Sequence, residues 1–466
     1  MNLYTGRILK INLSDESILV DNLNLEWAEK YIGGKGLGFR YLFDSLNPLI
    51  DPLSPPNVLI FMTGPVTGTI LPCSSRLCVV TKSPSTGTIL DSNMGGSFGA
   101  EIKYAGYDAL IISGRAKEPV YIVINNDSVE IKNAQFLWGK GIFKVDAEIK
   151  KELNNESYKT AIIGPAGENL VPFACITSES YRQAGRGGVG AVMGSKNLKG
   201  IAVNGSNGVK VANMQTFLDL AMKMQSETVS FEGNRWVIEE GSPWLVDYVN
   251  DELGILPTCN YQRGVFEAVK KIDTQSVRRM KKRDRACFSC PLACGNFTQA
   301  EGCMIEGPEY ETLVVAGANC GIDDISSIIK FNEICDDLGL DTISTGNVIA
   351  FIMEMTERKI YDFGIRFGER ENYLQIPEEI AYLKGRGKDI GLGVRELAAR
   401  YGGREFAMEV KGLEFPGYEV RGNYGIGLAY ATSDRGACHL RAFPLGHPTP
   451  FDLEAMVKQV ISEDRR

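Results

Sequence analysis

Short apolar runs follow one another through the first part of the chain. Segments such as RILKINL, VLIFMTG and ALIISGR are rich in Ile, Leu and Val and are bounded by turn residues. Runs of this length and composition between turn residues are typical of β-strands. We therefore predict that the chain is mostly sheet from Met1 to about Asn204.

The spacing of apolar residues changes after the polar segment NGSNG at residues 204–208. Beyond it, apolar side chains recur every three or four residues, which is typical of helices with one buried face. The clearest such segments are residues 214–225, 326–338, 345–357 and 453–461. Strands followed by helices predict an α+β protein or separate domains, and not alternating strand–helix units.

Composition and charge narrow the class of protein. The 466 residues suffice for about three domains, and 44% of them are hydrophobic. A formal net charge of −8 argues against nucleic acid as a partner, because binding to phosphates needs a basic surface. The N-terminus has no signal-peptide pattern, and nowhere do about 18 apolar residues run without a charge. We expect a cytoplasmic protein without a membrane segment.

Three of the eleven cysteines form the strongest chemical motif. Cys287, Cys290 and Cys294 have the spacing C-x2-C-x3-C, which lets one short loop present three thiolates to an iron–sulfur cluster. A zinc site that lacks its second cysteine pair, or three buried thiols, would be the alternatives. A [4Fe-4S] cluster needs a fourth ligand. Cys303 and Cys438 are the local candidates, although neither lies in a motif.

A basic segment stands directly before this loop in an otherwise acidic protein. Six Lys and Arg side chains fall within the eight residues from Arg278 to Arg285. This segment is either the solvated face of a helix or a docking surface for a small acidic electron carrier, since opposite charges speed encounter.

Four glycine-rich segments place backbone N–H groups next to Arg, Lys or Asn side chains, an arrangement that favours cofactors bearing phosphate. They begin at Gly33, Asp91, Gly185 and Arg435. The segment GAVMGSK has its hydroxyl and ammonium groups in the reverse order of a P-loop, which argues against ATP. The segment GKGLG lacks the spacing of a dinucleotide fingerprint, which disfavours NAD.

Histidine is scarce, since His439 and His447 are the only two in the chain. Sites built from several histidines are therefore excluded, and a catalytic imidazole must be one of these two. His439 lies between Arg435 and Arg441, whose charges favour a neutral imidazole. Glu311 precedes an apolar helix whose N-terminus would stabilise its charge, so helix capping alone would also explain it.

Seven segments together resemble the aldehyde ferredoxin oxidoreductases, and the resemblance runs over essentially the whole chain. They are GGKGLG at Gly33, SSR at Ser74, DSNMGG at Asp91, AGRGGVGAVMGSKNLK at Ala184, CFSCPLAC at Cys287, DDLGLD at Asp336 and SDRGACHLRAF at Ser433. Members of that family bind tungsten, or sometimes molybdenum, between two pterins beside a four-iron cluster. The resemblance implies a β-structured cofactor-binding domain at residues 1–208, a helical domain at 209–415 and the beginning of a second helical domain at 416–466.

The resemblance also implies roles for individual residues. The pterin and phosphate contacts of the base domain are matched in type and order by Arg76, Asn93, Gly95, Arg182 and Gly185. The loop that accepts hydrogen bonds from one pterin is matched by Asp336, Leu340 and Asp341. The contacts to the second pterin are matched by Arg435 and Arg441, and the pair that flanks the metal by Glu311 and His439.

The function implied by the resemblance is oxidation of a small aldehyde to a carboxylic acid. Electrons would leave a tungsten or molybdenum bis-pterin site through a [4Fe-4S] cluster to ferredoxin. His439 would polarise the aldehyde carbonyl, and Glu311 would take a proton from the attacking water or the tetrahedral intermediate. Two alternatives stay open: the catalytic subunit of an aromatic acyl-CoA ring reductase of the same superfamily, and an inactive chain that binds pterin without turnover.

The chain departs from the family pattern in two ways. Family members continue beyond the position that aligns with Arg466 and carry there a second Asp-x-x-Gly-Leu motif, which ends in the fourth cluster cysteine. We therefore expect a second polypeptide, an interrupted gene or a reduced form with another cluster ligand. The interface iron of some members needs an E-x-x-H pattern, and no His precedes His439. A homodimer would therefore form without that iron.

Overall fold

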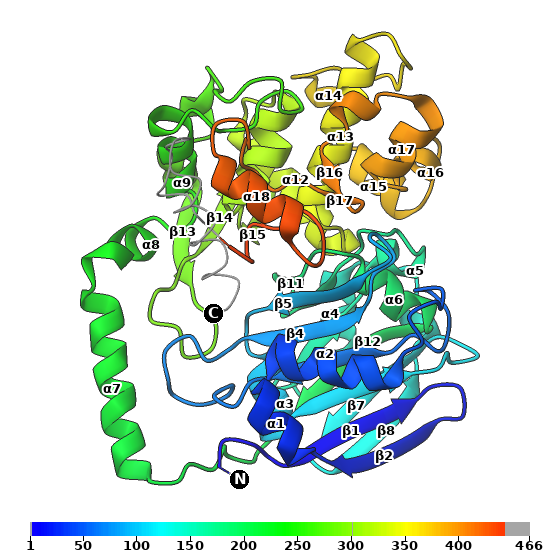
Figure 1. The fold of residues 1–466 in the computed structure, drawn as a ribbon, viewed down its shortest axis with the longest axis vertical. Helices are drawn as coiled ribbons and strands as arrows, with labels where there is room; N and C mark the ends of the chain where they lie inside the picture. Colours follow the sequence, from blue (N-terminus) through cyan, green and yellow to red (C-terminus); the bar gives the residue numbers. More distant parts are fainter. Residues whose placement is uncertain (1, 301, 443–466) are drawn as a thin grey trace. The chain divides into compact units, whose positions relative to one another are not determined.

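The computed structural model describes residues 2–300 and 302–442, and these divide into two compact units. The first unit comprises the residues up to Ile238, Ala286–Ala293 and Asp336–Leu340. The second comprises Glu239–Arg285, Cys294–Cys335 and the described residues from Asp341 onward. Strands dominate the first unit and helices the second, so the prediction of an α+β protein is confirmed (Figure 1). The helix predicted at 453–461 lies outside the described residues.

The first sheet of the first unit has six strands in the order β2-β1-β6-β3-β4-β5. Strands β1 and β6 are parallel, and all other neighbours are antiparallel. The strands are β1 (Arg7–Asn12), β2 (Ser17–Asn22), β3 (Leu59–Thr63), β4 (Leu77–Lys82), β5 (Ile89–Met94) and β6 (Ala109–Ser113).

The second sheet of this unit also has six strands, in the order β11-β10-β9-β12-β7-β8. Only β12 and β7 are parallel in it. The strands are β7 (Val120–Asn125), β8 (Ser128–Asn133), β9 (Lys159–Ile162), β10 (Ile176–Ser178), β11 (Arg182–Ala184) and β12 (Leu198–Asn204).

Apolar side chains on both faces of the central strands hold this unit together. On β3, Leu59 and Phe61 join a core cluster that also contains Ile122 and Ile124 of β7 in the second sheet. The intervening Ile60 belongs to a separate cluster on the opposite face of the first sheet. Successive side chains of a strand point to opposite faces, so a continuous apolar run buries both. The two sheets therefore pack face to face.

Helices cover the outer face of each sheet. On the first sheet, Leu37 of α2 (Gly34–Ser45) packs in the outer cluster, as does Val145 of α4 (Ile142–Glu152) on the second. The segment GKGLG is therefore the first turn of a helix and not an open loop. A Cβ atom on Gly38 would lie only 2.7 Å from Val80 Cγ2, so glycine there permits close packing of helix on strand.

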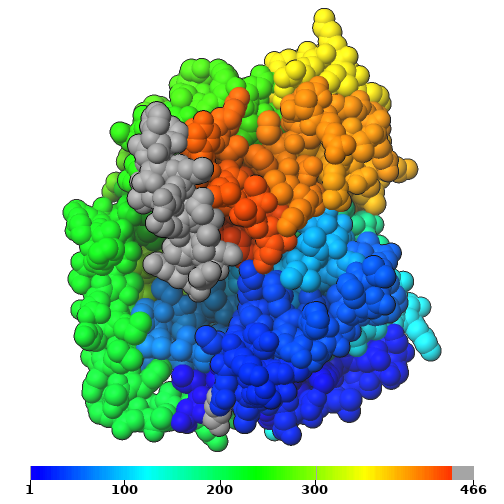
Figure 2. All heavy atoms as spheres, in the orientation of Figure 1, coloured from blue at the N-terminus to red at the C-terminus, as the bar shows by residue number. Residues whose placement is uncertain are grey.

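The sequence predicts a helix at residues 214–225, and the structure has α7 (Met214–Ser230) there. Ala221 is its one buried residue, and side chains such as Met222 and Val229 are exposed. The side chains of α7 lie at the surface in the space-filling view, where they are green (Figure 2). The apolar spacing therefore predicted the helix correctly, but almost none of the apolar side chains of α7 are buried.

Helices make up most of the second unit. Among the described residues of this unit, the longest helix is α13 (Thr342–Glu357), where residues 343–356 are all buried, and α12 (Ile325–Leu338) precedes it. These helices match the segments predicted at 326–338 and 345–357. Further helices are α9 (Trp244–Asp247), α10 (Thr274–Met280), α11 (Tyr310–Thr312), α15 (Ile376–Ala381), α16 (Gly387–Ile390), α17 (Val394–Tyr401) and α18 (Tyr424–Thr432). A small antiparallel sheet has the order β13-β14-β15, with β13 (Lys281–Arg285), β14 (Gly295–Ala300) and β15 (Cys303–Glu306).

Within the described residues, no single helix is both long and apolar enough to cross a membrane. One pair of segments, Tyr310–Cys320 and Ile325–Leu338, reaches the required length and composition together, but with a bend of 118° between them.

Candidate active site

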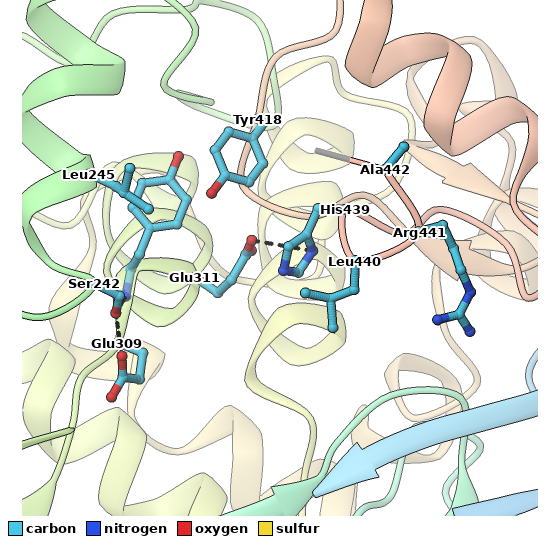
Figure 3. Close-up of a pocket in the computed structure, with 10 residues that line it drawn as sticks. Ser242, Leu245, Glu309, Glu311, Tyr418, His439, Leu440, Arg441 and Ala442 are labelled. Atoms are coloured by element: carbon cyan, nitrogen blue, oxygen red, sulfur yellow. Dashed lines mark hydrogen bonds and ion pairs between the residues drawn. The ribbon is translucent and has the colours of Figure 1, made fainter. Parts of the chain in front are cut away.

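Glu311 and His439, which the sequence predicts to flank a metal, lie side by side in the second unit (Figure 3). Glu311 is the central residue of α11, and His439 lies in the loop that follows α18. The imidazole Nδ1 is 3.6 Å from the carboxylate Oε1, and the two side chains are only 16% and 17% exposed. A protonated imidazole would form an ion pair with the carboxylate across this distance.

The backbone of a distant residue orients the Glu311 carboxylate. The N–H of Gly417 donates to Oε2 at 2.8 Å, while Oε1 faces His439. A Cβ atom on Gly417 would lie 3.0 Å from the Val314 side chain, so glycine allows this close approach. Glu311 therefore binds a partner 106 positions away in the chain, which helix capping alone does not explain.

A cavity of about 650 Å³ lies beside this pair (Figure 3). It is lined by Ser242, Leu245, Glu309, Tyr310, Glu311, Tyr418, His439, Leu440, Arg441 and Ala442. A cavity of this size with apolar walls and a few polar groups is typical of sites for small organic molecules.

Two tyrosines form one wall of the cavity. The rings of Tyr310 and Tyr418 are stacked, with centroids 4.9 Å apart. The Tyr310 hydroxyl donates to the carbonyl of Gly417 at 2.5 Å. Burial raises the pKa of both hydroxyls well above the ordinary value. Both therefore stay protonated near neutral pH, where they can donate hydrogen bonds but cannot act as bases.

The buried thiol of Cys438 accepts hydrogen bonds within the loop that carries His439. Arg435 donates to Cys438 Sγ from Nε at 3.2 Å and from Nη2 at 2.9 Å, and the N–H of Leu440 donates at 3.3 Å. Burial alone raises the pKa of the Cys438 thiol, but the charges of Arg435 and Arg441 outweigh it and lower the pKa overall. The predicted pterin contact Arg435 is thus bound to Cys438 and is 2% exposed.

Arg441, the other predicted contact to the second pterin, lines the cavity. Its Nε is 3.0 Å from Asp434 Oδ1, within the same loop. The Arg441 side chain therefore borders the cavity next to His439 and forms an ion pair with the Asp434 carboxylate.

Four of the residues predicted to bind pterin or phosphate in the first unit lie close together. Strands β4 and β5 pair with Leu77 opposite Met94, so Arg76 and Gly95, the next residues along, share one end of the sheet. Asn93 Nδ2 donates to Asp91 Oδ2 at 3.2 Å. A Cβ atom on Gly96 would lie 3.0 Å from Arg182 Cγ, so Arg182 lies against the same glycine backbone. The fifth residue, Gly185, directly follows β11.

The DDLGLD segment, which begins at Asp336, divides between the two units. Asp336 accepts a hydrogen bond from Gln183, and the buried Leu340 forms a β-bridge with Ala174, all within the first unit. Asp341 belongs to the second unit and caps α13, accepting from the N–H groups of Ile343 and Ser344 at 3.1 and 3.4 Å. Its carboxylate therefore also has a structural role, as a helix N-cap.

The three predicted cluster cysteines also divide between the units, with Cys287 and Cys290 in the first and Cys294 in the second. A thiol that the sequence did not indicate lies beside the first two. Cys73 Sγ is 3.5 Å from Cys290 Sγ, and burial together with the neighbouring sulfurs of Cys290 and Cys287 raises the pKa of Cys73 to about 11. Cys73 was missed because it precedes the motif by more than two hundred residues.

No three His, Cys, Asp or Glu side chains in the described part of the chain converge closely enough to hold a metal ion. The two local candidates for a fourth cluster ligand lie in the second unit. Cys303 is buried on β15, and Cys438 accepts hydrogen bonds from Arg435.

The basic segment from Arg278 to Arg285 covers the end of α10 and all of β13. Arg278 is 3.0 Å from Glu240, and Lys281 is 2.6 Å from Asp284, so part of its charge is neutralised locally. The basic segment is thus partly helix and partly strand. Some of its basic side chains form ion pairs with nearby carboxylates, and Lys282 is exposed.

Two family models match the chain. The model described as the N-terminal domain of aldehyde ferredoxin oxidoreductase matches residues 8–205, and the model described as its domains 2 and 3 matches residues 219–465. The chain belongs to the aldehyde ferredoxin oxidoreductase family. It is accordingly an oxidoreductase, as the sequence predicts.

Several relatives are similar to this aldehyde ferredoxin oxidoreductase family member over most of its length. Tungsten-containing aldehyde ferredoxin oxidoreductases of Pyrococcus furiosus and Thermococcus kodakarensis are each 43% identical over 465 residues, which cover 96% of this chain and 76% of each relative. A WOR-like subunit of an aliphatic sulfonate oxidoreductase of Pyrococcus furiosus is 30% identical, covering 94% of this chain and 75% of the relative.

One solved structure resembles the fold closely. It is the active site complex BamBC of benzoyl coenzyme A reductase with 1,5-dienoyl-CoA, which matches with a TM-score of 0.85 at 28% identity. The match covers 98% of this chain and 73% of the other. The aldehyde ferredoxin oxidoreductase fold is therefore present across the chain described above.

Within this family, the resemblance predicts Glu311 and His439 as site residues, but no pattern in the sequence indicates the residues around them. Tyr310 precedes Glu311 in the segment GPEYE, and Tyr418 lies in PGYE, but neither segment has a distinctive spacing. Gly417 acts through its backbone N–H, which no side-chain pattern reveals. Only the fold brings these residues to the carboxylate.

Proposed function

We propose that this protein oxidises a small aldehyde to the corresponding carboxylic acid and passes the electrons through a [4Fe-4S] cluster to ferredoxin or a similar carrier. The observation that carries the proposal is the Glu311–His439 pair in the wall of a cavity of about 650 Å³. The tungsten-containing aldehyde oxidoreductases at 43% identity support it. The reaction converts an aldehyde and water into the acid, two protons and two electrons.

Glu311 and His439 divide the proton chemistry between them. A ring N–H of His439 that donates to the aldehyde oxygen makes the carbonyl carbon more electrophilic. Glu311 Oε1 then takes the proton that water loses as it attacks that carbon. Because Gly417 fixes Oε2, the carboxylate keeps Oε1 directed at the reacting groups.

The buried tyrosines complete the site. Tyr310 and Tyr418 present flat ring surfaces and exclude water from one side of the cavity. With Leu245 and Leu440, they give the cavity an apolar wall that suits the hydrocarbon part of an aldehyde.

The tungsten-containing relatives support a tungsten, or alternatively molybdenum, bis-pterin as the cofactor. When bound, this group would accept the two electrons released by the substrate. The first unit offers groups that fit a phosphate-bearing pterin. The exposed guanidinium of Arg76 and the backbone of Gly95 share one end of the sheet, with Asn93 and Arg182 nearby.

Two carboxylates fit the N–H groups of a pterin ring. Asp336 and Asp341 can accept such hydrogen bonds, and each carboxylate offers about four lone-pair sites. Asp341 already accepts from the N–H groups of Ile343 and Ser344 in α13 and from the Ser344 hydroxyl. Asp341 would therefore hold the pterin and the helix together. We assign Arg435 and Arg441 to the second pterin, with Arg441 as the one that lines the cavity.

Electrons would leave through a cluster held by Cys287, Cys290 and Cys294, whose thiolates are the usual ligands of iron–sulfur clusters. The basic segment from Arg278 to Arg285 suits an acidic carrier such as ferredoxin. The similar benzoyl-CoA reductase chain was solved in a complex, and the sulfonate relative is a subunit. Both support a second polypeptide as a further partner, and a homodimer stays a prediction.

The proposal is tested by the metal content and substrate range of protein purified anaerobically from its native host. We expect tungsten or molybdenum, pterin and iron in fixed ratio to the chain, and reduction of a viologen dye with short aldehydes. Protein that is loaded with metal but turns over no aldehyde would contradict the proposal.

A second candidate function is reduction of an aromatic coenzyme A thioester. The observation that favours it is the TM-score of 0.85 to benzoyl-CoA reductase over 98% of this chain. The same preparation assayed with benzoyl-CoA and a low-potential donor separates the two functions. Consumption of the thioester without aldehyde oxidation would favour the second.

A further inference from the structure

One peptide group of the second unit binds the Glu311 carboxylate directly. The N–H of Gly417 donates to Glu311 Oε2 at 2.8 Å, and the carbonyl of Pro416 belongs to the same peptide group. Because a trans peptide group is planar, its N–H and its C=O point in opposite directions. A group that binds the Pro416 oxygen therefore also fixes the direction of the N–H that binds Glu311.

The hydroxyl of Tyr261, in the same unit, binds that oxygen. It lies 2.8 Å from the carbonyl oxygen of Pro416 and 2.9 Å from that of Phe415, so its one proton is shared between them. Tyr261 is 2% exposed, and its ring packs edge-on against Phe415 with centroids 5.8 Å apart. Hydrogen bonds in series polarise one another, so a bond to the Pro416 oxygen makes the Gly417 N–H a stronger donor.

The main chain of Tyr261 is bound to the other side of Gly417. Its carbonyl accepts a hydrogen bond from Arg421 Nη2, and Arg421 Nε donates to Glu419 Oε1 at 2.9 Å. The N–H of Glu419 donates in turn to the carbonyl of Ile255 at 2.9 Å. Tyr261 therefore contacts residues both before and after Gly417.

A strained turn of the backbone directs the Tyr261 side chain. Cys259, Asn260 and Tyr261 have φ values of +51°, +51° and +60°, in the left-handed region that residues with a side chain seldom adopt. Such conformations cost free energy and persist only where the surroundings hold them. Asn260 is held in this way, because its Nδ2 donates to Glu354 Oε2 at 2.6 Å and its N–H to the Asn319 carbonyl at 2.9 Å.

The two carbonyls that Tyr261 binds also have other donors. The Phe415 carbonyl accepts from Asn347 Nδ2 at 2.9 Å, and the Pro416 carbonyl accepts from the N–H of Tyr418 at 2.7 Å. Loss of the Tyr261 hydroxyl therefore leaves neither carbonyl without a donor, and we expect the unit to fold without it. The Tyr418 donor lies within the same short segment, whereas Tyr261 binds the segment from outside.

We propose that Tyr261 is a positioning residue for aldehyde oxidation, an inference that rests on the proposed function with Glu311 as the base. Its hydroxyl fixes the peptide group between Pro416 and Gly417, whose N–H holds Glu311 Oε2. The other oxygen, Oε1, then stays directed at His439, 3.6 Å away (Figure 3). Tyr261 is not among the residues that line the cavity, so it acts through the peptide group and does not touch the substrate.

A double-mutant cycle tests this role in the full chain, purified anaerobically with its cofactors. It compares Tyr261→Phe, Glu311→Gln and the double variant, with Tyr373→Phe as the matched control. Tyr373 is also fully buried, and its hydroxyl donates to the Ala316 carbonyl at 2.7 Å.

We expect Tyr261→Phe to lower kcat about 3- to 30-fold and to change KM less than about twofold. In the Glu311→Gln background, the same substitution should lower kcat no further, because the carboxylate that Tyr261 positions is already absent. Tyr373→Phe should keep the wild-type kcat, and all variants should keep the wild-type metal content.

Hydrogen exchange at the Gly417 amide gives a second measurement that needs no substrate. Mass spectrometry of fragments that resolve this amide compares the wild type with Tyr261→Phe and Tyr373→Phe. We expect exchange at Gly417 to be at least about threefold faster in Tyr261→Phe and unchanged in Tyr373→Phe.

Distinct results separate this inference from the proposed function. The inference is overturned if Tyr261→Phe lowers kcat by the same factor with and without the Glu311 carboxylate, or leaves both kcat and exchange at Gly417 unchanged. A Tyr261→Phe protein that does not fold, beside a folded Tyr373→Phe, would also contradict a role confined to Gly417. If metal-loaded wild type oxidises no aldehyde, the proposed function fails, and the exchange data alone decide whether Tyr261 fixes this peptide group.

Discussion

Single residues carry the chemistry of the proposed site, and Glu311 is the most direct to change. Glu311→Gln keeps the shape and can still accept from Gly417, but it removes the carboxylate that takes a proton. We expect kcat for aldehyde oxidation to fall about 10²- to 10⁴-fold, with tungsten and iron content unchanged.

Glu357→Gln is the matched control for this variant. Glu357 is exposed at the end of α13 and accepts from Gln262. Steady-state assays with a viologen dye should give wild-type kcat for it. If Glu311→Gln retains more than a tenth of the wild-type kcat, Glu311 is not the base.

Lys196 gives a stability prediction with a definite pH dependence. Its ammonium is buried against the carbonyls of Pro55, Asn57 and Gly114, and burial lowers its pKa to about 7. The ammonium is protonated in both states below pH 7, where its burial destabilises the fold. Between pH 7 and its ordinary value of 10.5, only the unfolded state holds the proton, so the free energy of unfolding rises with pH.

We expect wild type to gain stability relative to Lys196→Met between pH 7 and 9, by up to about 1.4 kcal/mol per pH unit. Urea unfolding of both proteins across this range measures the difference. A difference that is constant or falls with rising pH would contradict the assignment.

At the residue scale, the sequence predicted chemistry only where residues form a local motif or match the family. Glu311 and His439 were predicted through the resemblance to the family. Cys73 lies in the segment LPCSSR, and nothing in that segment links it to the cysteine loop. Cys73 lies beside Cys290 only because of how the first unit folds, and residue spacing along the chain does not predict this contact.

At the scale of elements, the loop after α18 is the clearest case of a fold that positions a functional group. The Cys438 thiol accepts three hydrogen bonds that tie Arg435 and Leu440 together on either side of His439. Removing this acceptor leaves the buried guanidinium of Arg435 without those bonds.

We expect Cys438→Ala to lower the free energy of unfolding by about 3 kcal/mol and to reduce kcat more than tenfold. Cys438→Ser keeps an oxygen acceptor and should recover part of both losses. Thermal unfolding and steady-state assays of the two variants provide the comparison. Equal behaviour of the Ala variant and the wild type would show that the thiol does not position His439.

The basic segment at α10 and β13 gives a prediction about partner binding. Lys282 is exposed and is not among the residues that line the cavity. We expect Lys282→Glu to raise KM for ferredoxin several-fold at low ionic strength, while the rate with a neutral dye is unchanged. The effect should fade as salt is added, because screening weakens it. A KM that does not change at low salt would remove this segment from the docking surface.

Element prediction succeeded where burial follows the local pattern. Most strands of both sheets and the helices α12 and α13 follow from apolar runs and spacing, whereas β5 (Ile89–Met94), β10 and β11 were not predicted as strands. The segment GKGLG reads as a phosphate-binding loop, but it forms the first turn of α2, since its glycines permit close packing on β4. Helix packing and phosphate binding both favour glycine, and the sequence does not separate them.

At the scale of the whole molecule, the change from strands to helices predicted the α+β class. The composition of the two units is less visible in the sequence, because neither is one continuous stretch. Ala286–Ala293 and Asp336–Leu340 belong to the first unit, although the helical unit surrounds both in the sequence. A pattern along the chain assigns residues that are neighbours in sequence to the same domain. The contacts in the fold, however, place these two short segments in the first unit.

The central claim is that this chain oxidises aldehydes at the Glu311–His439 site. The rate of viologen reduction by anaerobically purified, tungsten-loaded protein supplied with a short aldehyde tests it most directly. We predict turnover on the order of 1 to 10³ s⁻¹, dependent on aldehyde and absent without it. Tungsten-loaded protein that reduces no dye with any short aldehyde would contradict the claim.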